Sequence, residues 1–405
     1  MPHKSKSSAH SDPIPQNGIP LHKKKIEWKE YKLGEVANLS TRKMPISEVV
    51  SDNYISTENM IENKGGVKQA SSIPGTGNAT KYSVGDILIS NIRPYFKKIW
   101  MANRNGGCSN DVLCLVPNEE LVNRKYLYYT LCQDVFFDYV MLGSKGCKMP
   151  RGDKSHIMNW RFVFPPLSEQ KRIASILGSL DDKIDLLHRE NATLEAMAET
   201  LFRHYFIENP NPEWKEGKVS IYADHYKVSL NPKKSLKSVF SHYSIPAFDQ
   251  GKTPSMETGE SIQSNKYSIP GDCILFSKLN PHRDKRVWMI EGDLPDNPVC
   301  STEFQIVFPK EKEYLFFLYG WLTNKENYSE IASGVGGTSG SHQRIDPKAI
   351  FSFSCPLVDA NYLREYNNMI SPLFLKQRNN QEEIFNLTKQ RNILLTEFLS
   401  EKARS

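Results

Sequence analysis

The sequence lacks the features of a membrane-spanning or disulfide-stabilised protein. No run of about 18 apolar residues occurs among its 405 residues, so a transmembrane helix is not expected. The first residues contain no apolar segment of the kind that a secretory signal needs. The seven cysteines are an odd number and form no C-x-x-C pair. This argues against a disulfide framework or a zinc site and favours the reducing cytoplasm.

Motifs of catalysis are also missing from the sequence. The glycine-rich stretch Gly334–Ser341 lacks the lysine of a P-loop. There is no Asn-Pro-Pro-aromatic motif of adenine methylation, and Asn209–Pro212 is better interpreted as a linker. The ten histidines show no metal-binding spacing. We therefore expect a non-catalytic chain that binds no cofactor or metal of its own.

Charge of one sign is not in large excess. The 52 lysines and arginines exceed the 46 acidic residues by only six. Most of this excess lies in the first globular region, between about residues 28 and 167. The balance favours a nucleic-acid partner, but weakly, because many proteins that bind no nucleic acid carry a similar charge.

The chain contains two copies of one pattern. Trp28-Lys29-Glu30 recurs as Trp214-Lys215-Glu216, and YSVGDILIS at 82–90 recurs as YSIPGDCILFS at 267–277. Cys108-Ser109 likewise recurs as Cys300-Ser301. The offset stays between 185 and 192 residues for all matches, which appear in the same order. Such an ordered series indicates a tandem duplication of a globular unit followed by a helix.

Each globular unit is predicted to be mixed α/β, which gives an α+β fold class. Short apolar runs that follow Gly-Asp or end at proline predict buried strands at 86–90 and 112–117, and again at 273–277 and 304–309. Helical spacing with aromatic faces follows at 125–141 and 313–332. We interpret these aromatic residues as core packing.

A long helix is predicted over 168–207, with Ser168 as its N-cap after Pro165-Pro166. At about 1.5 Å per residue it would be roughly 60 Å long. Apolar residues alternate at spacings of four and three, which is a heptad seam rather than the wider stripe of a helix lying on a globular core. The seam comprises Ile173, Leu177, Leu180, Ile184, Leu187, Asn191, Leu194, Ala198, Leu201 and Tyr205.

A second helix near the C-terminus carries a less regular seam. It comprises Asn380, Ile384, Leu387, Arg391, Leu394 and Phe398. Pro372 is expected to break or kink the preceding part. The two seams most simply pair as an antiparallel coiled coil, which would hold the globular units apart at opposite ends. Asn191 would fix the register, and Asn191→Leu would raise thermal stability while loosening the pairing.

The helical segments resemble a known family. PPLSEQKRIASILGSLDDKIDLLHRENATLEAMAETLFRHYF, from Pro165 onward, is similar to the central conserved region of specificity subunits of type I restriction-modification systems. NLTKQRNILLTEFLS, which ends at Ser400, is similar to their C-terminal conserved region. WKEYKLGEVA and GDILIS also fit the pattern. The resemblance extends over about residues 28–400.

The resemblance implies domain boundaries in this chain and a role for each domain. It implies target recognition domains at 26–167 and 209–357, and helical spacers at 168–208 and 358–405. Residues 1–25 are rich in serine, proline, histidine and lysine, a composition that predicts a disordered tail. Each recognition domain would read one half of a bipartite double-stranded DNA target. The helices would set the gap and dock two methyltransferase subunits, which carry S-adenosylmethionine and methylate adenine N6. A separate restriction and translocase subunit would cleave unmodified DNA.

Two polar, basic regions in each unit are candidate DNA contacts. Side chains of these types bind phosphates, and arginine, asparagine or glutamine can also read base edges. A solvated charged turn or a mobile surface loop is the alternative interpretation for each. In the first unit the candidates are Asn91, Arg93, Lys97, Lys98, Lys145, Lys148, Arg151 and Lys154. In the second unit they are Lys278, Asn280, His282, Arg283, Lys285, Arg286, Ser341, His342, Gln343 and Arg344.

Two other classes of function are left open by the residues. A coiled-coil scaffold with two protein-binding heads would fit the mild charge of the second unit. A stand-alone enzyme would need a catalytic constellation that the sequence does not contain. Absence of DNA binding even with partner chains present would favour the scaffold. Turnover by the isolated chain would favour the enzyme.

Overall fold

The computed structural model describes residues 28–333, 335–336 and 344–399. The chain divides into two compact units. Unit 1 contains the chain up to Leu180 together with the part from Arg391 onward, and unit 2 contains Asp181–Gln390. Each of the two long helices contributes a segment to both units.

Unit 1 is built mainly from short strands. They are β1 (Lys29–Lys32), β2 (Ala37–Leu39), β3 (Lys43–Pro45), β4 (Tyr54–Ile55), β5 (Asn78–Tyr82), β6 (Ile87–Ser90), β7 (Ile99–Met101), β8 (Gly106–Cys108), β9 (Val112–Pro117) and β10 (Arg161–Phe164). The short helices are α1 (Leu33–Val36), η1 (Ile46–Glu48), η2 (Pro94–Phe96), α2 (Arg124–Leu131), α3 (Asp134–Leu142) and α4 (Lys154–Met158). One sheet has the strand order β2-β9-β6-β7, a second has β3-β5-β8-β4, and β1 pairs with β10.

Unit 2 contains a corresponding set of strands. They are β11 (Glu216–Lys218), β12 (Ala223–Tyr226), β13 (Ser229–Leu230), β14 (Val239–Tyr243), β15 (Ser255–Thr258), β16 (Lys266–Ser268), β17 (Cys273–Ser277), β18 (Val287–Ile290), β19 (Pro298–Cys300), β20 (Phe304–Pro309), β21 (Val335–Gly336), β22 (Arg344–Ile345) and β23 (Ser354–Pro356). Its short helices are α6 (Val219–Tyr222), η4 (Pro232–Ser235), α7 (Ile245–Asp249), η5 (Lys312–Tyr314), α8 (Leu315–Thr323), α9 (Lys325–Ser333) and α10 (Pro347–Phe351).

The strand orders of unit 2 repeat those of unit 1. The sheet β12-β20-β17-β18 corresponds to β2-β9-β6-β7, and the pair β11-β23 corresponds to β1-β10. The registers correspond as well, because Leu88 lies opposite Cys114 and Leu275 lies opposite Ile306. Unit 2 has a longer second sheet, β13-β16-β19-β14-β15, and an additional hairpin, β21-β22. The predicted duplication is therefore confirmed at the level of strand pairing.

The four strands predicted from apolar runs are present as β6, β9, β17 and β20. Residues of β6 and β17 are buried throughout, which explains why these runs show no apolar–polar alternation. Gly85 lies in the turn before β6 with φ of +87°, a conformation that favours glycine. In the same turn Asp86 accepts a hydrogen bond from the backbone N–H of Ser83 at 2.8 Å.

The aromatic helical segments form the cores, as predicted. Each expected segment is divided into two helices, α2 and α3 in unit 1 and α8 and α9 in unit 2. Tyr126, Phe136 and Phe137 are buried in unit 1, and Phe317 is buried in unit 2. These rings pack edge-on against others, for example Tyr126 against Phe164 at 5.1 Å between ring centroids. The aromatic stripes are therefore accounted for by packing.

The two long helices are α5 (Leu167–Arg203) and α11 (Ala360–Leu399). A π-helical turn, η3 (His204–Glu208), follows α5 directly. Ser168 was expected as the N-cap, but α5 begins one residue earlier, so Ser168 lies in the first turn. The expected break at Pro372 is wrong, because α11 continues through it. Pro372 is exposed, while Leu363, Tyr366 and Ile370 anchor the preceding turns in the core of unit 2. Their burial offsets the lost backbone donor.

Every predicted seam position of α5 is buried or half-buried. The expectation of a narrow seam along its whole length is nevertheless wrong. At its beginning Ala174 joins Ile173 and Leu177 in the core of unit 1. At its end Phe202 and Phe206 join Ala198 in the core of unit 2. A globular body covers an additional side of the helix in these places, so the apolar stripe widens there.

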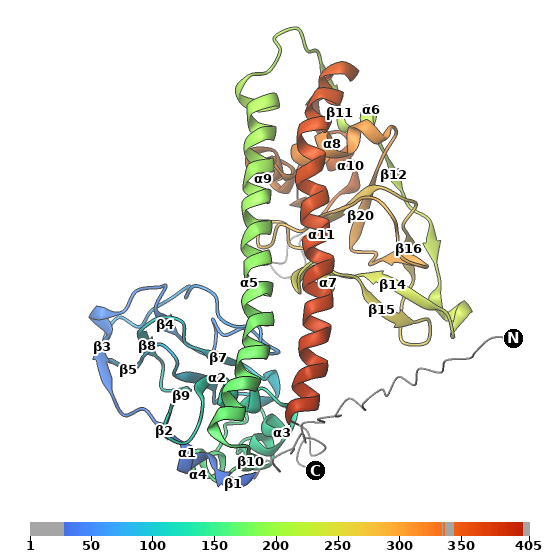
Figure 1. The fold of residues 1–405 in the computed structure, drawn as a ribbon. Coiled ribbons are helices and arrows are strands. Elements are labelled where there is room, and N and C mark those ends of the chain that lie inside the picture. Colours follow the sequence, from blue (N-terminus) through green and yellow to red (C-terminus); the bar gives the residue numbers. More distant parts are fainter. Residues whose placement is uncertain (1–27, 334, 337–343, 400–405) are drawn as a thin grey trace, which may run out of the picture. The chain divides into compact units, whose positions relative to one another are not determined.

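A narrow two-helix seam is present in the part of α5 and α11 that belongs to unit 2. Ile184 and Leu187 form a small apolar cluster with Ile384 and Leu387. Lys183 lies 3.4 Å from Glu383, and Glu190 lies 3.4 Å from Lys376. Partner numbers in α11 fall as those in α5 rise, so the two helices run antiparallel, side by side (Figure 1). In unit 1 the same trend brings Arg172 over the ring of Phe398.

All seven cysteines lie in the described ranges and are reduced thiols, six of them buried and Cys147 exposed. Burial raises the pKa of the Cys108 thiol to about 12, so it stays protonated at neutral pH. Within the described ranges, no helix combines the length and apolarity that crossing a membrane requires.

Candidate nucleic-acid interface

The two candidate regions of unit 1 come together in the structure. The segment after β6 and the loop before α4 form a β-bridge between Ile92 and Arg151. The backbone N–H of Arg93 donates to the carbonyl of Pro150 at 2.8 Å, and that of Gly152 donates to the carbonyl of Asn91 at 3.1 Å. Two regions that are distant in the sequence therefore present one surface.

Unit 2 repeats this junction at the equivalent positions. Leu279, after β17, forms a β-bridge with Arg344. The backbone N–H of Ile345 donates to the carbonyl of Lys278 at 3.0 Å. The matching bridges and backbone hydrogen bonds show that Asn91 and Lys278 occupy equivalent positions in the two units, as do Arg151 and Arg344.

The segment after each central strand turns through a left-handed residue followed by proline. Arg93 has φ of +50° before Pro94, and Asn280 has φ of +46° before Pro281. A left-handed conformation is costly for residues other than glycine, by about 1 kcal/mol for a residue such as arginine. The left-handed turn is kept in both copies, with a cost at Arg93 and a smaller one at Asn280, because asparagine adopts this conformation more readily.

An arginine of each junction forms an ion pair with an acidic residue that the sequence reasoning missed. Arg151 Nη2 lies 2.7 Å from Asp111 Oδ1, and Arg344 Nη2 lies 2.7 Å from Glu303 Oε1. Each acid directly precedes a central strand, β9 or β20. The signal was present in the repeat, because Cys108-Ser109-Asn110-Asp111 and Cys300-Ser301-Thr302-Glu303 place an acid at the same spacing.

Further exposed basic or polar side chains lie on the segments that form each junction. In unit 1, Lys145, Lys148 and Lys154 are exposed, and Lys145 lies 3.3 Å from Asp153. Asp153 also caps α4 by accepting from the backbone N–H of His156, and this bond, with Lys145, lowers the pKa of Asp153. In unit 2, His282 and Arg283 are exposed on the segment after β17. These side chains are accessible to a phosphate backbone.

Three further candidates of unit 1 are buried or bound to other groups of the protein. Asn91 is buried, and its Oδ1 has no hydrogen-bond partner among the described residues. Lys97 forms an ion pair with Asp134 at 3.1 Å. Lys98 donates to the carbonyl of Thr57 at 2.9 Å, and burial lowers its pKa. We assign these three to the shape of the loop and the exposed cations to its surface.

Two candidates of unit 2 are likewise held by the protein. The guanidinium of Arg286 bonds both oxygens of Asp249, at 2.7 and 2.9 Å, and its side chain is only 13% exposed. Lys285 donates to the carbonyl of Thr323. Burial also lowers the pKa of Lys278, and the carboxylate of Glu303 opposes this effect. Ser341, His342 and Gln343 lie outside the described residues.

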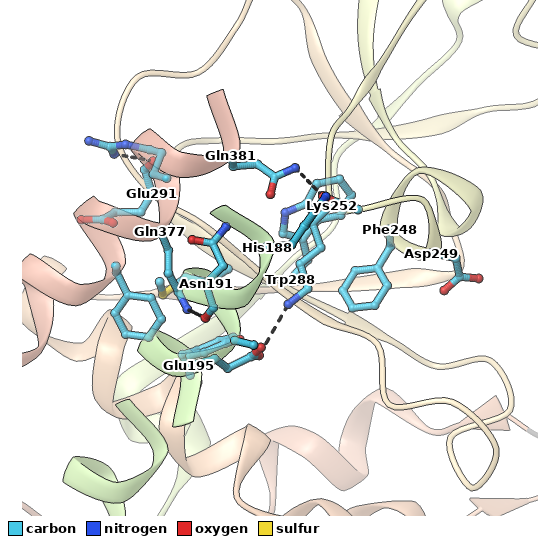
Figure 2. Close-up of a pocket in the computed structure, with 16 residues that line it drawn as sticks. His188, Asn191, Glu195, Phe248, Asp249, Lys252, Trp288, Glu291, Gln377 and Gln381 are labelled. Carbon is cyan, nitrogen blue, oxygen red and sulfur yellow. Dashed lines mark hydrogen bonds and ion pairs between the residues drawn. The ribbon is translucent and has the colours of Figure 1, made fainter. Parts of the chain in front are cut away.

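A separate cavity of about 440 Å³ with a mixed polar and apolar lining lies in unit 2, between the helix pair and the sheet (Figure 2). Gln381 of α11 donates to the carbonyl of Gly251 at 2.7 Å and to the hydroxyl of Thr253 at 3.0 Å. Lys252 Nζ lies 3.7 Å from Glu195 of α5. These contacts fasten both helices to the loop after α7, so the cavity belongs to the joint between helices and sheet.

Among the described residues, no cluster of histidine, cysteine or acidic side chains could hold a metal ion. The fold and the two junctions define the class of the molecule. It is a duplicated α+β module with one arginine-bearing loop junction in each copy, and each copy is joined to two long helices.

Comparison with known proteins agrees with this class. Residues 25–196 match the family model described as the type I restriction modification DNA specificity domain. The HindI type I restriction enzyme specificity subunit of Haemophilus influenzae is 26% identical over 189 residues, 45% of this chain and 41% of that protein. The MjaIX specificity subunit of Methanocaldococcus jannaschii is 24% identical over 321 residues, 69% of each chain. The matched part thus spans less than half of the first relative and about two thirds of the second.

A solved structure shares the fold. The crystal structure of the type I restriction-modification S subunit from M. genitalium has a TM-score of 0.58 and 15% identity, and the match covers 96% of this chain and 98% of that one. Over residues 25–196 the chain is similar to the DNA specificity domain of type I restriction-modification systems, and over 321 residues it is similar to a specificity subunit of such a system. The resemblance inferred from its helices is therefore confirmed.

Proposed function

We propose that this chain is the DNA sequence-specificity subunit of a type I restriction-modification complex. In this proposal, recognition domains at 26–167 and 209–357 each read one half of a bipartite target in double-stranded DNA. The observation that carries the proposal is the equivalent junction in both copies, each with an exposed arginine. Two copies of one reader suit a target with two parts.

The helices at 168–208 and 358–405 set the gap between the half-sites and dock two methyltransferase subunits. Those subunits carry S-adenosylmethionine and methylate adenine N6, and a restriction and translocase subunit completes the complex. This chain itself binds no cofactor and performs no catalysis. The names of its relatives, which are specificity subunits of restriction enzymes, support this division of labour.

Chemically, the exposed lysines would neutralise phosphates and fix the position of each domain on the duplex. Arg151 and Arg344 are the best candidates for base readout, because a guanidinium can donate two parallel hydrogen bonds to O6 and N7 of guanine. Asn91, Lys97 and Lys98 would shape the first loop rather than contact the bases.

The test is long-read detection of N6-methyladenine in cells with and without this gene, with the methyltransferase genes left intact. The proposal predicts that one split motif with a fixed gap disappears when the gene is deleted. Re-expression of the wild-type gene should restore the motif. An unchanged methylome, with the methyltransferase expressed, would count against the proposal and favour the scaffold with two protein-binding heads.

A further inference from the structure

We propose that Asp111 and Glu303 are the specificity-determining positioning residues of the two recognition domains. Each carboxylate holds the arginine of its own junction in the orientation that reads a base, and each acts on one half-site only. This inference rests on the function proposed above and deepens it, because it assigns a role to residues that carry the wrong charge for binding DNA.

The first argument is geometric. The backbone carbonyl of Asp111 accepts from the N–H of Asn91 at 2.8 Å, and that of Glu303 accepts from the N–H of Lys278 at 3.0 Å. The arginine comes from the opposite side of the same segment, through the bridges at Ile92 and Leu279. In each unit the backbone of the acid and that of a residue next to the arginine are therefore both hydrogen-bonded to the segment that follows the central strand, β6 or β17. The ion pair between the side chains of the acid and the arginine is a further contact between them.

The second argument is that both units contain the ion pair although the residues around it differ between them. Unit 1 uses aspartate and unit 2 uses glutamate, yet the shortest N···O distance is 2.7 Å in both. The segments that carry the arginines differ in sequence, with KMPRG before α4 in unit 1 and SHQRI before α10 in unit 2. The charge and the contact are retained while the chain length of the acid is not.

The third argument is electrostatic. A carboxylate beside DNA weakens non-specific binding, because that binding comes from neutralising phosphates. An amide could accept the same hydrogen bond without this repulsion. A negative charge at the same position in both copies therefore needs a benefit other than affinity. Selectivity is such a benefit, because it can come from a repulsive element as well as from a new contact.

The guanidinium groups are suited to this role. The side chains of Arg151 and Arg344 are 58% and 54% exposed, so the ion pair occupies one edge of each fork and leaves other donors accessible. A guanidinium held in place loses less side-chain freedom when it binds, which favours the one base whose acceptors match it. A freely rotating guanidinium would bind phosphates or other bases equally well.

The experiment uses cells that carry the full gene and its methyltransferase genes. The variants Asp111→Asn and Glu303→Gln remove the charge but keep an acceptor, whereas Asp111→Glu and Glu303→Asp keep the charge. Glu30→Gln is the matched control, since Glu30 forms a surface ion pair with Arg161 at 2.9 Å in unit 1, on β1 and β10. The readout is the frequency of each base at each position of both half-sites in long-read methylation data.

We expect Asp111→Asn to relax one half-site and Glu303→Gln to relax the other, each by about tenfold in discrimination at one or two base positions. Each variant thereby controls for the other. The charge-preserving variants should keep the wild-type motif, as should Glu30→Gln. In gel-shift assays on the purified complex, both amide variants should bind random-sequence duplex more tightly than wild type.

Two outcomes would overturn the inference. In one, both half-sites keep their wild-type base frequencies in the amide variants. In the other, methylation falls at all sites without any change of motif and the melting temperature of the complex falls with it, which would reveal a purely structural ion pair. Failure of the proposed function is a different result: deletion of the gene itself would leave the methylome unchanged, and the inference would fail with it.

Discussion

The side-chain amide of Asn380 donates to the side-chain oxygen of Asn191 at 2.9 Å, which joins α11 to α5 in the middle of their pairing. Asn380 also donates to Glu190 at 2.9 Å, and Gln377 donates to the backbone carbonyl of Asn191 at 3.1 Å. Asn380 is 1% exposed. Asn191 is half-buried, and the Oδ1 atom of Asn380 has no hydrogen-bond partner among the described residues. The two bonds that the Asn380 amide group donates can form in one register only, so they fix how far one helix slides along the other.

This pairing changes the expected effect of Asn191→Leu. The single substitution leaves Asn380 buried with one partner fewer, which should cost about 1–3 kcal/mol of stability. The double variant Asn191→Leu/Asn380→Leu removes both polar groups and should recover that loss or exceed it, with weaker control of register. Thermal unfolding of the single and double variants, analysed as a double-mutant cycle, measures the coupling. Additive effects would show that the two amides do not depend on each other.

A second prediction concerns the apolar part of the same seam. Leu187 is buried beside Ile384, whereas its neighbour Leu186 is half-exposed on the outer face. Leu187→Ala should lower the free energy of unfolding by about 2–5 kcal/mol, because it leaves a cavity between the helices. Leu186→Ala has the same chemistry and should change it by no more than about 0.5 kcal/mol. Denaturant unfolding of both variants makes the comparison. Equal losses of unfolding free energy in the two variants would show that Leu187 is not on the face of α5 that packs against α11.

Much of this fold could be predicted because its determinants are local or repeated. The heptad spacing placed Leu187 and Ile384 on facing seams, and the repeat predicted matching strands such as β6 and β17. The widening of the stripe at Phe202 could not be read from spacing, because it depends on a globular body that packs against the helix. The unbroken helix at Pro372 depends in the same way on the burial of Tyr366 and Ile370.

The candidate site was predicted only in part for a similar reason. Residue type identified Arg151 and Arg286 equally well as cations in basic segments. Only the fold shows that Arg286 is enclosed by Asp249 and that Arg151 projects from the junction. Asp111 was passed over because a negative charge does not suggest DNA binding. Its repeat partner Glu303 was the available signal, and it gained meaning once both acids were found beside arginines.

A third prediction separates two arginines three positions apart. Arg283→Ala should leave stability within about 0.5 kcal/mol, because the side chain is exposed. It should also reduce the dependence of DNA binding on salt by about one unit of the logarithmic slope. Arg286→Ala should instead lower stability by about 1–3 kcal/mol, because it leaves Asp249 without its bidentate partner.

The measurements are thermal unfolding of the chain and titration of its methyltransferase complex onto random-sequence duplex at several salt concentrations. Lys389→Ala, an exposed lysine of α11, is the control for loss of one positive charge. An unchanged salt slope for Arg283→Ala would remove that residue from the interface.

The last prediction concerns pH and the buried imidazole of His242 on β14. Burial lowers its pKa from the ordinary value of 6.5, although the carboxylate of Glu257, 2.9 Å from Nδ1, acts in the opposite direction. The unfolded chain therefore takes up a proton at a pH where the folded chain does not. Stability contributed by the neutral imidazole is complete above about pH 6.5 and is lost progressively as the pH falls below it.

His242→Gln should flatten this dependence below about pH 6.5, at some cost in stability at neutral pH, because the substitution changes the bond to Glu257. His282→Gln, which replaces an exposed histidine, is the control for the substitution itself. Melting temperatures of the three proteins across this range are the measurement. If the curve of His242→Gln runs parallel to that of the wild type, groups other than His242 bind the proton that destabilises unit 2 in acid.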